Sequence, residues 1–378
     1  MFTSTDEFSD NIDKLILHLI NDYLKDDFIR DLVKACDDSN PLYKMVQDHL
    51  KGVVIPARSS SKESTFTDSI ISLYGFLESY LEKLVEEYIT SINEASIPIA
   101  ALPSTIRERH LELSMSYIQR VTKHRLMEGD DKFVCEKEVI EKLNGFLQGE
   151  SDYSLNCKAF SGHTNFNYDS IQKLFAQVGI EKIAERTLGL NYVTDQLAKR
   201  LQQEPTEDTA TLKAWLESEL RDLSLLRNAI AHGAFEGTFE NTELIIDRAE
   251  FLKQFGIAVG TIVLRTFEEL VFHGKERQVL GNADKAYAQT SCFGFKGKVL
   301  GADDDTFTIK VGDEIYAHNA KSGDKLLKGS VQGIMLNKEP VDEMDFPNAL
   351  DCGIKVDFVV ASTMTNREIS VVKAPLSS

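Results

Sequence analysis

Cysteine is scarce in this sequence, and its few cysteines follow no pattern. Five cysteines are spread over 378 residues without a Cys-x-x-Cys pair, at Cys36, Cys135, Cys157, Cys292 and Cys352. An odd and dispersed set argues against a disulfide framework and against a zinc site. We therefore expect reduced thiols, as in a cytoplasmic protein.

Long hydrophobic runs are also absent. No apolar stretch approaches the roughly 18 residues needed to cross a bilayer. Residues 1–16 are acidic and contain neither the basic n-region nor the apolar h-region of a signal peptide. Hydrophobic residues still make up 42% of the chain, which is typical of a globular protein with a buried core. The sequence thus predicts a cytoplasmic protein without a membrane partner.

Positive charge is in short supply. The chain has 42 lysines and arginines against 60 aspartates and glutamates, for a net charge of −18. This balance argues against broad, sequence-blind binding to nucleic acid, which depends on releasing phosphate counterions. Residues 105–127 are a local exception, because five basic residues face only two acidic ones: Arg107, Arg109, Arg120, Lys123 and Arg125. This segment is either a track that binds the phosphates of RNA or a solvated helix face.

Several motifs of common enzymes are missing. The sequence contains no Gly-x-x-x-x-Gly-Lys-Ser/Thr, no His-Glu-x-x-His and no Gly-x-Ser-x-Gly. P-loop nucleotide hydrolysis, zinc proteolysis and serine hydrolysis of the α/β type are therefore not supported. We expect neither a metal nor an organic cofactor.

Apolar residues at helical spacing dominate the first 272 residues. Residues 5–50 predict two or three short helices, and the serine-rich stretch Ala57–Thr65 predicts an exposed linker. Residues 148–167 carry turn-forming residues and predict an irregular segment. The remaining helices are predicted at Ser69–Ile92, Ser104–Met127, Glu136–Leu147, Tyr168–Gln177, Asn191–Gln202, Thr209–His232 and Arg248–Phe272.

The pattern changes to a strand rhythm after Ser291. Short apolar runs separated by glycine and aspartate, such as FTIKV, EIYAH and EISVV, predict a small β-barrel or sandwich of about 85 residues. We interpret it as a partner or sensor module. The expected domains are a helical N-terminal region at 1–58, a helical bundle at 66–280 and the β-domain at 291–378.

The most informative motif is Arg-Asn-Ala-Ile-Ala-His-Gly at Arg227–Gly233. It ends a helix with regularly spaced leucines, which place it on a packed scaffold. At about 100° per residue, Arg227, Asn228 and His232 share one side of the helix. A fixed cation, an amide and a titratable imidazole suit a phosphodiester substrate, because the reaction needs a proton shuttle and a charge that stabilises oxyanions.

The same residues also have a structural interpretation. Gly233 stands where a glycine commonly terminates a helix, and a histidine in the last turn interacts favourably with the helix dipole. Capping alone explains the pair from spacing, so this interpretation stays open.

The string LRNAIAHG resembles the signature of HEPN-domain ribonucleases, and most closely the subgroup associated with ribosomal-L-PSP-type neighbours in defence loci. Two further segments are similar to the family's opening helix and middle segment, Tyr74–Ile89 and His163–Ile180. The resemblance covers about Phe66–His273. It implies a mostly α protein, in which a HEPN-like antiparallel helical bundle carries a helical N-terminal extension and a small C-terminal all-β domain.

The resemblance also implies a chemistry. Members usually form homodimers in which the motif helices of two protomers face each other. Two copies of His232 would then take and deliver the protons, Arg227 would hold the scissile phosphate of an RNA substrate, and Asn228 would orient the phosphate or the imidazole. Glu78 stands at the family's acidic position, either paired with the arginine or as a surface charge. No metal is required, and the products carry a 2′,3′-cyclic phosphate and a 5′-hydroxyl.

Two functions follow from the resemblance. The first is a metal-independent endoribonuclease of a prokaryotic defence or toxin–antitoxin system. The alternative is a non-catalytic HEPN-like dimer that binds RNA, nucleotide or a protein partner in a larger complex; a plain helical scaffold is the third interpretation. Ala234 replaces a tyrosine that is adenylylated in some relatives. We therefore expect any restraint to come from the flanking domains, from a regulatory protein that binds the N-terminal or C-terminal domain, or from an infection-linked trigger.

Overall fold

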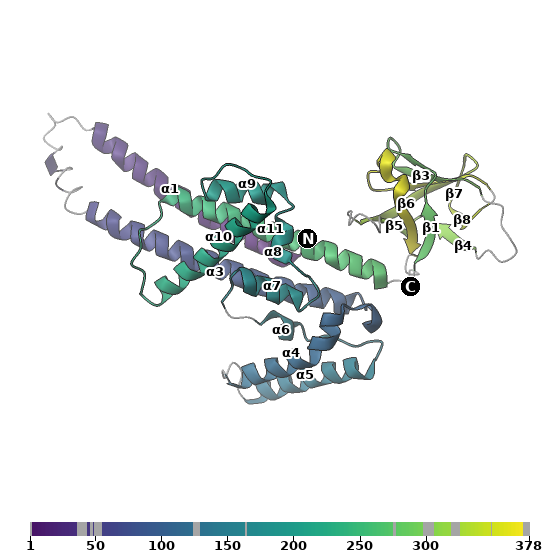
Figure 1. The fold of residues 1–378 in the computed structure, drawn as a ribbon, viewed down its shortest axis with the longest axis horizontal. Helices are drawn as coiled ribbons and strands as arrows, with labels where there is room; N and C mark the ends of the chain where they lie inside the picture. The colour runs from purple at the N-terminus through teal and green to yellow at the C-terminus, as the bar shows by residue number, and fades with distance from the viewer. Residues whose placement is uncertain are drawn as a thin grey trace. The chain divides into compact units, whose positions relative to one another are not determined.

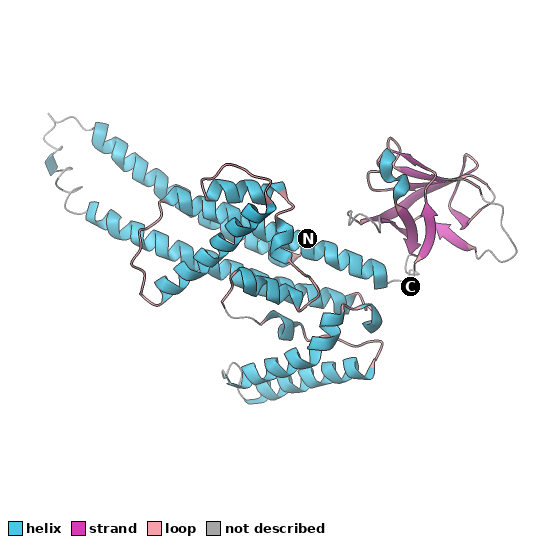
Figure 2. Cartoon of the chain, in the orientation of Figure 1, coloured by secondary structure: helices cyan, strands magenta, loops and turns pink. Residues whose placement is uncertain are grey.

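The apolar periodicity of the first two thirds of the chain produces helices, and the alternation that follows produces an antiparallel sheet (Figures 1 and 2). The computed structural model divides into two compact units, residues 1–267 and residues 268–378. It describes residues 2–35, 44–45, 48, 55–123, 129–162, 165–274, 277–297, 306–318, 326–348 and 350–372.

The first unit is helical. Its principal helices are α1 (Thr3–Ala35), α3 (Ile55–Glu94), α4 (Ser104–Lys123), α5 (Gly129–Gln148), α6 (Cys157–Ser161), α7 (Tyr168–Ala176), α8 (Ile183–Thr187), α9 (Asn191–Arg200), α10 (Thr209–Ala231) and α11 (Thr242–Gly274), with a 3-10 turn at Ile99–Ala101. Each helix predicted between residues 69 and 272 corresponds to an observed helix, although α3 begins 14 residues and α5 seven residues before the predicted start. The end predicted for α4, residues 124–127, lies outside the described residues. In the part of the chain that the structure describes, no helix combines the length and apolar character needed to span a membrane.

The long helices α1, α3 and α11 pack against one another (Figure 1). The Phe8 ring of α1 stacks on Tyr80 of α3 at 4.5 Å between centroids. The Tyr80 hydroxyl donates a 2.7 Å hydrogen bond to the carbonyl of Gly256 in α11. A side chain at Gly256 would collide with the Phe8 ring, so the glycine allows this close approach. The N-terminal residues thus belong to the same packed unit as the rest of the bundle.

Two predictions about the N-terminal region need correction. Residues 3–35 form one long helix, α1, and not short helices, because Phe8, Ile12 and Leu19 form a continuous buried face against α3. Most of residues 36–50, the rest of the predicted short helices, lie outside the described residues. The serine-rich stretch at 57–65 is not a linker, since it lies inside α3.

The second unit is an antiparallel sheet that curls on itself. Its strands are β1 (Gln278–Asn282), β2 (Lys285–Tyr287), β3 (Cys292–Phe295), β4 (Phe307–Lys310), β5 (Glu314–His318), β6 (Leu327–Leu336), β7 (Glu339–Val341), β8 (Glu343–Phe346), β9 (Cys352–Val356) and β10 (Glu368–Val372), with a 3-10 turn at Ser362–Asn366. The main order is β1-β10-β5-β6-β9-β3-β2, with β7 beside β6, and β4 pairs with β8.

Strand β6 explains the curl. Its first half pairs with β5 and its second half with β9, and the register shifts between Val331 and Gly333. A bulge of this kind bends a strand so that it joins two parts of a sheet. The inward side chains form one core that includes Phe293, Ile315 and Ile354.

The β-unit begins earlier than the sequence predicted. Strand β1 starts at Gln278, before the expected boundary at 291, because its pairing partner β10 lies about 90 residues further along the chain. The last turns of α11 also belong to this unit, where Phe272 packs with Tyr316, Leu326 and Val372.

Candidate functional site

Helix α10 carries the Arg-Asn-x-x-x-His motif on a packed face. Asp208 caps its start by accepting a 3.0 Å hydrogen bond from the Thr211 amide. The leucines predicted to form the scaffold are Leu212, Leu216, Leu220, Leu223 and Leu226, of which the first four are buried and the last is half-buried. The motif therefore follows a rigid stretch of helix.

The helix ends inside the motif. Ala231 is its last residue, His232 occupies the cap position, and Gly233 adopts the left-handed conformation with φ of 66°. The amide of Ala234 then donates a 2.8 Å bond to the carbonyl of Ala229. The capping geometry that the structural interpretation predicted is confirmed. The His232 side chain is exposed, and among the described residues it contacts neither Arg227 nor Asn228.

Arg227 and Asn228 lie together. Arg227 is half-buried, and its Nη1 donates a 2.9 Å hydrogen bond to Oδ1 of Asn228. The guanidinium carbon lies 4.8 Å from the centroid of the Tyr74 ring in α3. The part of the chain that the structure describes offers Arg227 no carboxylate partner. Its positive charge is thus oriented by neighbours without being neutralised by them.

Tyr74 is the partner of the motif that sequence reasoning missed. Its side chain is 1% exposed, and its hydroxyl accepts a 2.6 Å hydrogen bond from the Phe166 amide. Burial raises the pKa of Tyr74, and nearby Glu78 adds to this increase, while Phe166 and Arg227 act in the opposite direction. The ring is a neutral, fixed platform. No spacing rule links it to a motif about 150 residues away.

Glu78 lies one helical turn after Tyr74 on α3 and is half-buried. It forms no ion pair with Arg227 within the described chain. The accessory residue suggested by the resemblance is therefore close to the Tyr74 platform, but the structure does not bring it into contact with the motif arginine.

The segment after the motif is anchored by aromatic rings. Phe235 and Phe239 both pack on Phe66 of α3, at centroid distances of 5.4 and 5.6 Å, and they lie 5.6 Å from each other. This cluster fixes the path of the chain directly after His232.

A buried charge network holds the same segment. Arg200 of α9 pairs with Glu219 at 3.2 Å and with Glu240 at 2.6 Å, and Arg248 of α11 pairs with the same two carboxylates at 3.0 and 2.8 Å. Burial alone would raise the pKa of Glu240, but Arg248 and Arg200 outweigh it and hold that pKa below its usual value. Sequence reasoning missed the network because its four members come from separate segments.

The basic segment on α4 is only partly brought together. Arg109 pairs with Glu112 at 3.3 Å. Arg120 lies over the Tyr117 ring at 5.5 Å, and at about 100° per residue it shares a face with Arg109, whereas exposed Arg107 lies on the opposite side. The Lys123 side chain and Arg125 lie outside the described residues. The described arginines thus do not form one continuous track.

Comparison with known proteins gives a family match. The model of the family described as RiboL-PSP-HEPN aligns with residues 37–264, which is more than half of the chain and includes the motif of α10. No curated protein and no solved structure matches the sequence.

Proposed function

The chain belongs to the RiboL-PSP-HEPN family, and from this premise we propose that it is a metal-independent endoribonuclease of a prokaryotic defence or toxin–antitoxin system. Its site comprises Arg227, Asn228 and His232, it acts in the cytoplasm as a homodimer, and its substrate is RNA. A regulatory protein that binds the N-terminal helix or the β-unit restrains it.

One observation carries the proposal. The Arg227 guanidinium is stacked on Tyr74 and bonded to Asn228, and it has no carboxylate partner in the described chain. A planar and oriented guanidinium without a carboxylate partner can donate hydrogen bonds to two oxygens of one phosphate. Its charge also stabilises the negative charge that develops during cleavage. Two buried arginines of the same unit, Arg200 and Arg248, are by contrast paired with carboxylates.

The chemistry needs two proton-transfer groups. The 2′-oxygen loses its proton to one imidazole and bonds to phosphorus, the bond from phosphorus to the 5′-oxygen breaks, and a second imidazole gives the leaving oxygen a proton. In the part of the chain that the structure describes, His232 is the histidine of the motif that carries Arg227, and its side chain is exposed. The two roles therefore fall to His232 of each protomer in a dimer, and the products are a 2′,3′-cyclic phosphate and a 5′-hydroxyl.

A second candidate function is a non-catalytic dimer that binds RNA, nucleotide or a protein. The observation in its favour is the helix end itself, where His232 stands at the cap and its side chain contacts neither Arg227 nor Asn228. In that case the motif stabilises a helix terminus and the bound partner remains intact.

RNA cleavage in EDTA separates the two candidates. We expect wild type to cleave and Arg227→Ala and His232→Ala to lose activity by about 100-fold or more, since each removes a group needed in the transition state. Arg221→Ala, an exposed arginine on the same helix, is the matched control and should retain wild-type activity.

Circular dichroism and thermal melting of each variant complete the experiment. Cleavage that persists in both folded variants would refute the site, and absence of cleavage by wild type with retained RNA binding would support the non-catalytic dimer. Unfolding of both variants would assign the motif to helix-end stability.

A further inference from the structure

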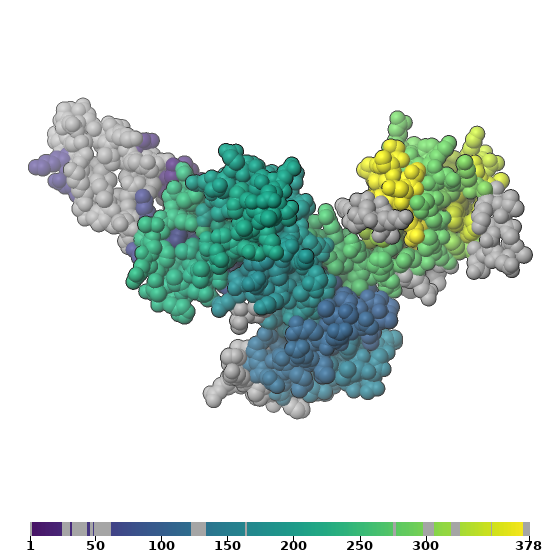
Figure 3. Space-filling model, in the orientation of Figure 1, coloured from purple at the N-terminus to yellow at the C-terminus, as the bar shows by residue number. Residues whose placement is uncertain are grey.

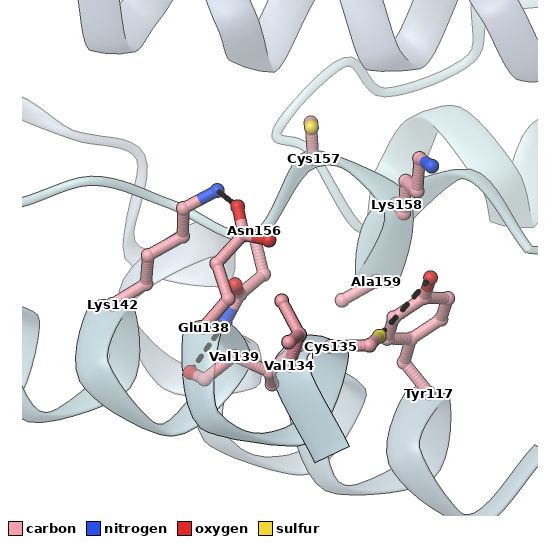
Figure 4. Close-up of a pocket in the computed structure, with 10 residues that line it drawn as sticks. All are labelled: Tyr117, Val134, Cys135, Glu138, Val139, Lys142, Asn156, Cys157, Lys158 and Ala159. Carbon is pink, nitrogen blue, oxygen red and sulfur yellow. Dashed lines mark hydrogen bonds and ion pairs between the residues drawn. The ribbon is translucent and has the colours of Figure 1, made fainter. Parts of the chain in front are cut away.

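A cavity unrelated to the motif opens beside the α4–α5 pair. Its volume is about 400 Å³, and it is bounded by α4, by α5 and by the segment that leads into α6 (Figure 4). In the space-filling view α4 and α5 form a lobe that protrudes from the rest of their unit (Figure 3). Val134, Val139 and Ala159 provide apolar walls. The size is at the lower end of the range of about 300–1,000 Å³ for small-molecule sites.

A fixed hydrogen-bond acceptor lines this cavity. Asn156 is 5% exposed, and its side-chain nitrogen donates to Oγ of Ser114 at 2.9 Å and to the carbonyl of Val139 at 3.2 Å. Its backbone amide donates to Nε2 of His110 at 3.1 Å. These bonds fix the amide with its nitrogen toward the helices. The Asn156 oxygen accepts no hydrogen bond from the residues that the structure describes.

The buried histidine behind Asn156 keeps this arrangement neutral. Burial lowers the pKa of His110 to about 4, so its imidazole is uncharged at neutral pH and Nε2 is an acceptor. Two aromatic rings enclose it, Phe146 at 4.8 Å and Phe160 at 5.8 Å between centroids. The acceptor of Asn156 is thus supported by a well-packed shell.

Tyr117 supplies a donor on the other side of the cavity. Burial, together with the nearby Cys135 thiol, raises the pKa of Tyr117 to about 12, so the phenol keeps its proton. The guanidinium of Arg120 lies 5.5 Å from the centre of the same ring. Glu86 also acts on Tyr117, in the opposite direction to Arg120 and more weakly. The neutral hydroxyl next to the cation is suited to donate to an anionic group of a ligand.

In the described part of the chain, the charged side chains that line the cavity are one carboxylate and two lysines, so positive charge is in excess. Lys142 is paired with Glu138 at 2.9 Å, and it holds the pKa of Glu138 below its usual range, with a smaller contribution from Lys158. Neither Lys158 nor Arg120 has a carboxylate partner among the described residues, and Arg120 donates to the Lys158 carbonyl at 3.4 Å. Figure 4 shows Lys158 and Tyr117 on one side of the cavity and Lys142 and Glu138 on the other.

We propose that this cavity binds a mononucleotide, with an N–H of the base donated to Asn156 and the phosphate held by Lys158 and the Tyr117 hydroxyl. The apolar walls accept the flat base, and the two cations without carboxylate partners attract the phosphate in a chain whose net charge is −18. The site is separate from Arg227 and His232, so the proposal does not depend on ribonuclease activity.

Calorimetric titration of the full-length protein tests the proposal with three probes: AMP, adenosine and inorganic phosphate. We expect AMP to bind, and adenosine and inorganic phosphate each to bind about tenfold more weakly or not at all, because each lacks one half of the contacts. Val134→Trp fills the cavity mouth from a position that is 60% exposed, so the fold should not change. It should weaken AMP binding about tenfold or more.

A charge reversal supplies the matched comparison. Lys158→Glu should weaken AMP binding by about tenfold or more and leave the weak adenosine binding unchanged. Lys137→Glu, an exposed lysine on α5 that does not line the cavity, should bind AMP like wild type. Absence of AMP binding, affinity for inorganic phosphate equal to that for AMP, or AMP binding that neither Val134→Trp nor Lys158→Glu reduces would each overturn the proposal.

Discussion

Asn228 contacts Arg227 directly. The family resemblance implies that Asn228 orients the phosphate or the imidazole, and in the structure its side-chain oxygen accepts a 2.9 Å hydrogen bond from the Arg227 guanidinium. Together with the Tyr74 ring, it restricts the guanidinium before any substrate binds. A cation that is already oriented stabilises the negative charge of a transition state without a further cost of reorganisation.

Two substitutions at Asn228 test this role. Asn228→Ala removes the hydrogen bond and keeps the charge of Arg227, so we expect cleavage to fall about tenfold. Asn228→Asp keeps an acceptor but neutralises the guanidinium through an ion pair, so we expect a loss of about 100-fold with unchanged thermal stability. Initial rates and melting temperatures are the measurements. Equal activity of the two variants would contradict the role of Asn228 as a neutral support.

Buried His110 predicts a pH-dependent stability. Its native pKa of about 4 lies below the value of 6.5 of a free imidazole, so between these values the unfolded chain binds more protons than the native one. Stability contributed by His110 is therefore complete above about pH 6.5 and decreases as the pH falls toward 4. We expect a loss of about 2 kcal/mol in unfolding free energy between about pH 7.5 and about pH 5.

Urea denaturation at these two pH values measures the effect. His110→Gln keeps an acceptor for the Asn156 amide but does not titrate, so its unfolding free energy should depend less on pH by the same amount. An identical pH dependence in wild type and His110→Gln would exclude His110 as the source.

At the scale of elements, the end of α10 and the segment after it are held from several directions. The buried network joins Arg200 of α9, Glu219 of α10 and Arg248 of α11 to Glu240, which lies shortly after the motif. The phenylalanine cluster adds contacts with α3. The backbone around His232 therefore depends on four helices, and disturbance of the network should affect stability first.

Glu219 is the member whose loss should cost most. Its side chain is 2% exposed, and Glu219→Ala leaves two buried arginines with a single remaining carboxylate. We expect a loss of about 3–5 kcal/mol in unfolding free energy, because an uncompensated buried charge is strongly unfavourable. Glu217→Ala, an exposed glutamate on the same helix, should cost less than about 1 kcal/mol. Denaturant titration of both variants measures these losses in unfolding free energy. Equal losses for Glu219→Ala and Glu217→Ala would show that the network contributes little to stability.

At the scale of the whole molecule, the family match covers only the helical unit and not the β-unit. The family match lies within residues 37–264 and ends before the β-unit begins. The proposed chemistry adds a second copy of the chain, because one protomer supplies one His232. Oligomeric state and catalysis are therefore linked in this proposal.

Subunit mixing tests the link. If two copies of His232 share one reaction, a large excess of His232→Ala protein should suppress the activity of wild type after subunit exchange, because most wild-type chains then lie in dimers with a single imidazole. Activity per wild-type chain that stays constant, or a cleaving protein whose solution mass is that of a monomer, would rule out the shared site.

The sequence determined most of the helices, the strand-rich C-terminus, the family and the motif, because these depend on local periodicity and on a short ordered string of residues. It misplaced features that depend on distant partners. The serine-rich stretch at 57–65 is helical, and β1 needs β10 to become a strand.

Only the tertiary structure decided what surrounds the motif and the second candidate site. The Tyr74 ring beneath Arg227, the four-charge network at Glu219 and the Asn156 cavity each join residues that are dozens to more than a hundred positions apart in the chain. Such contacts form when helices pack against each other. The spacing of apolar residues within one helix does not show which other helix will pack against it. The sequence alone could therefore identify the motif residues but could not identify the neighbours that orient them.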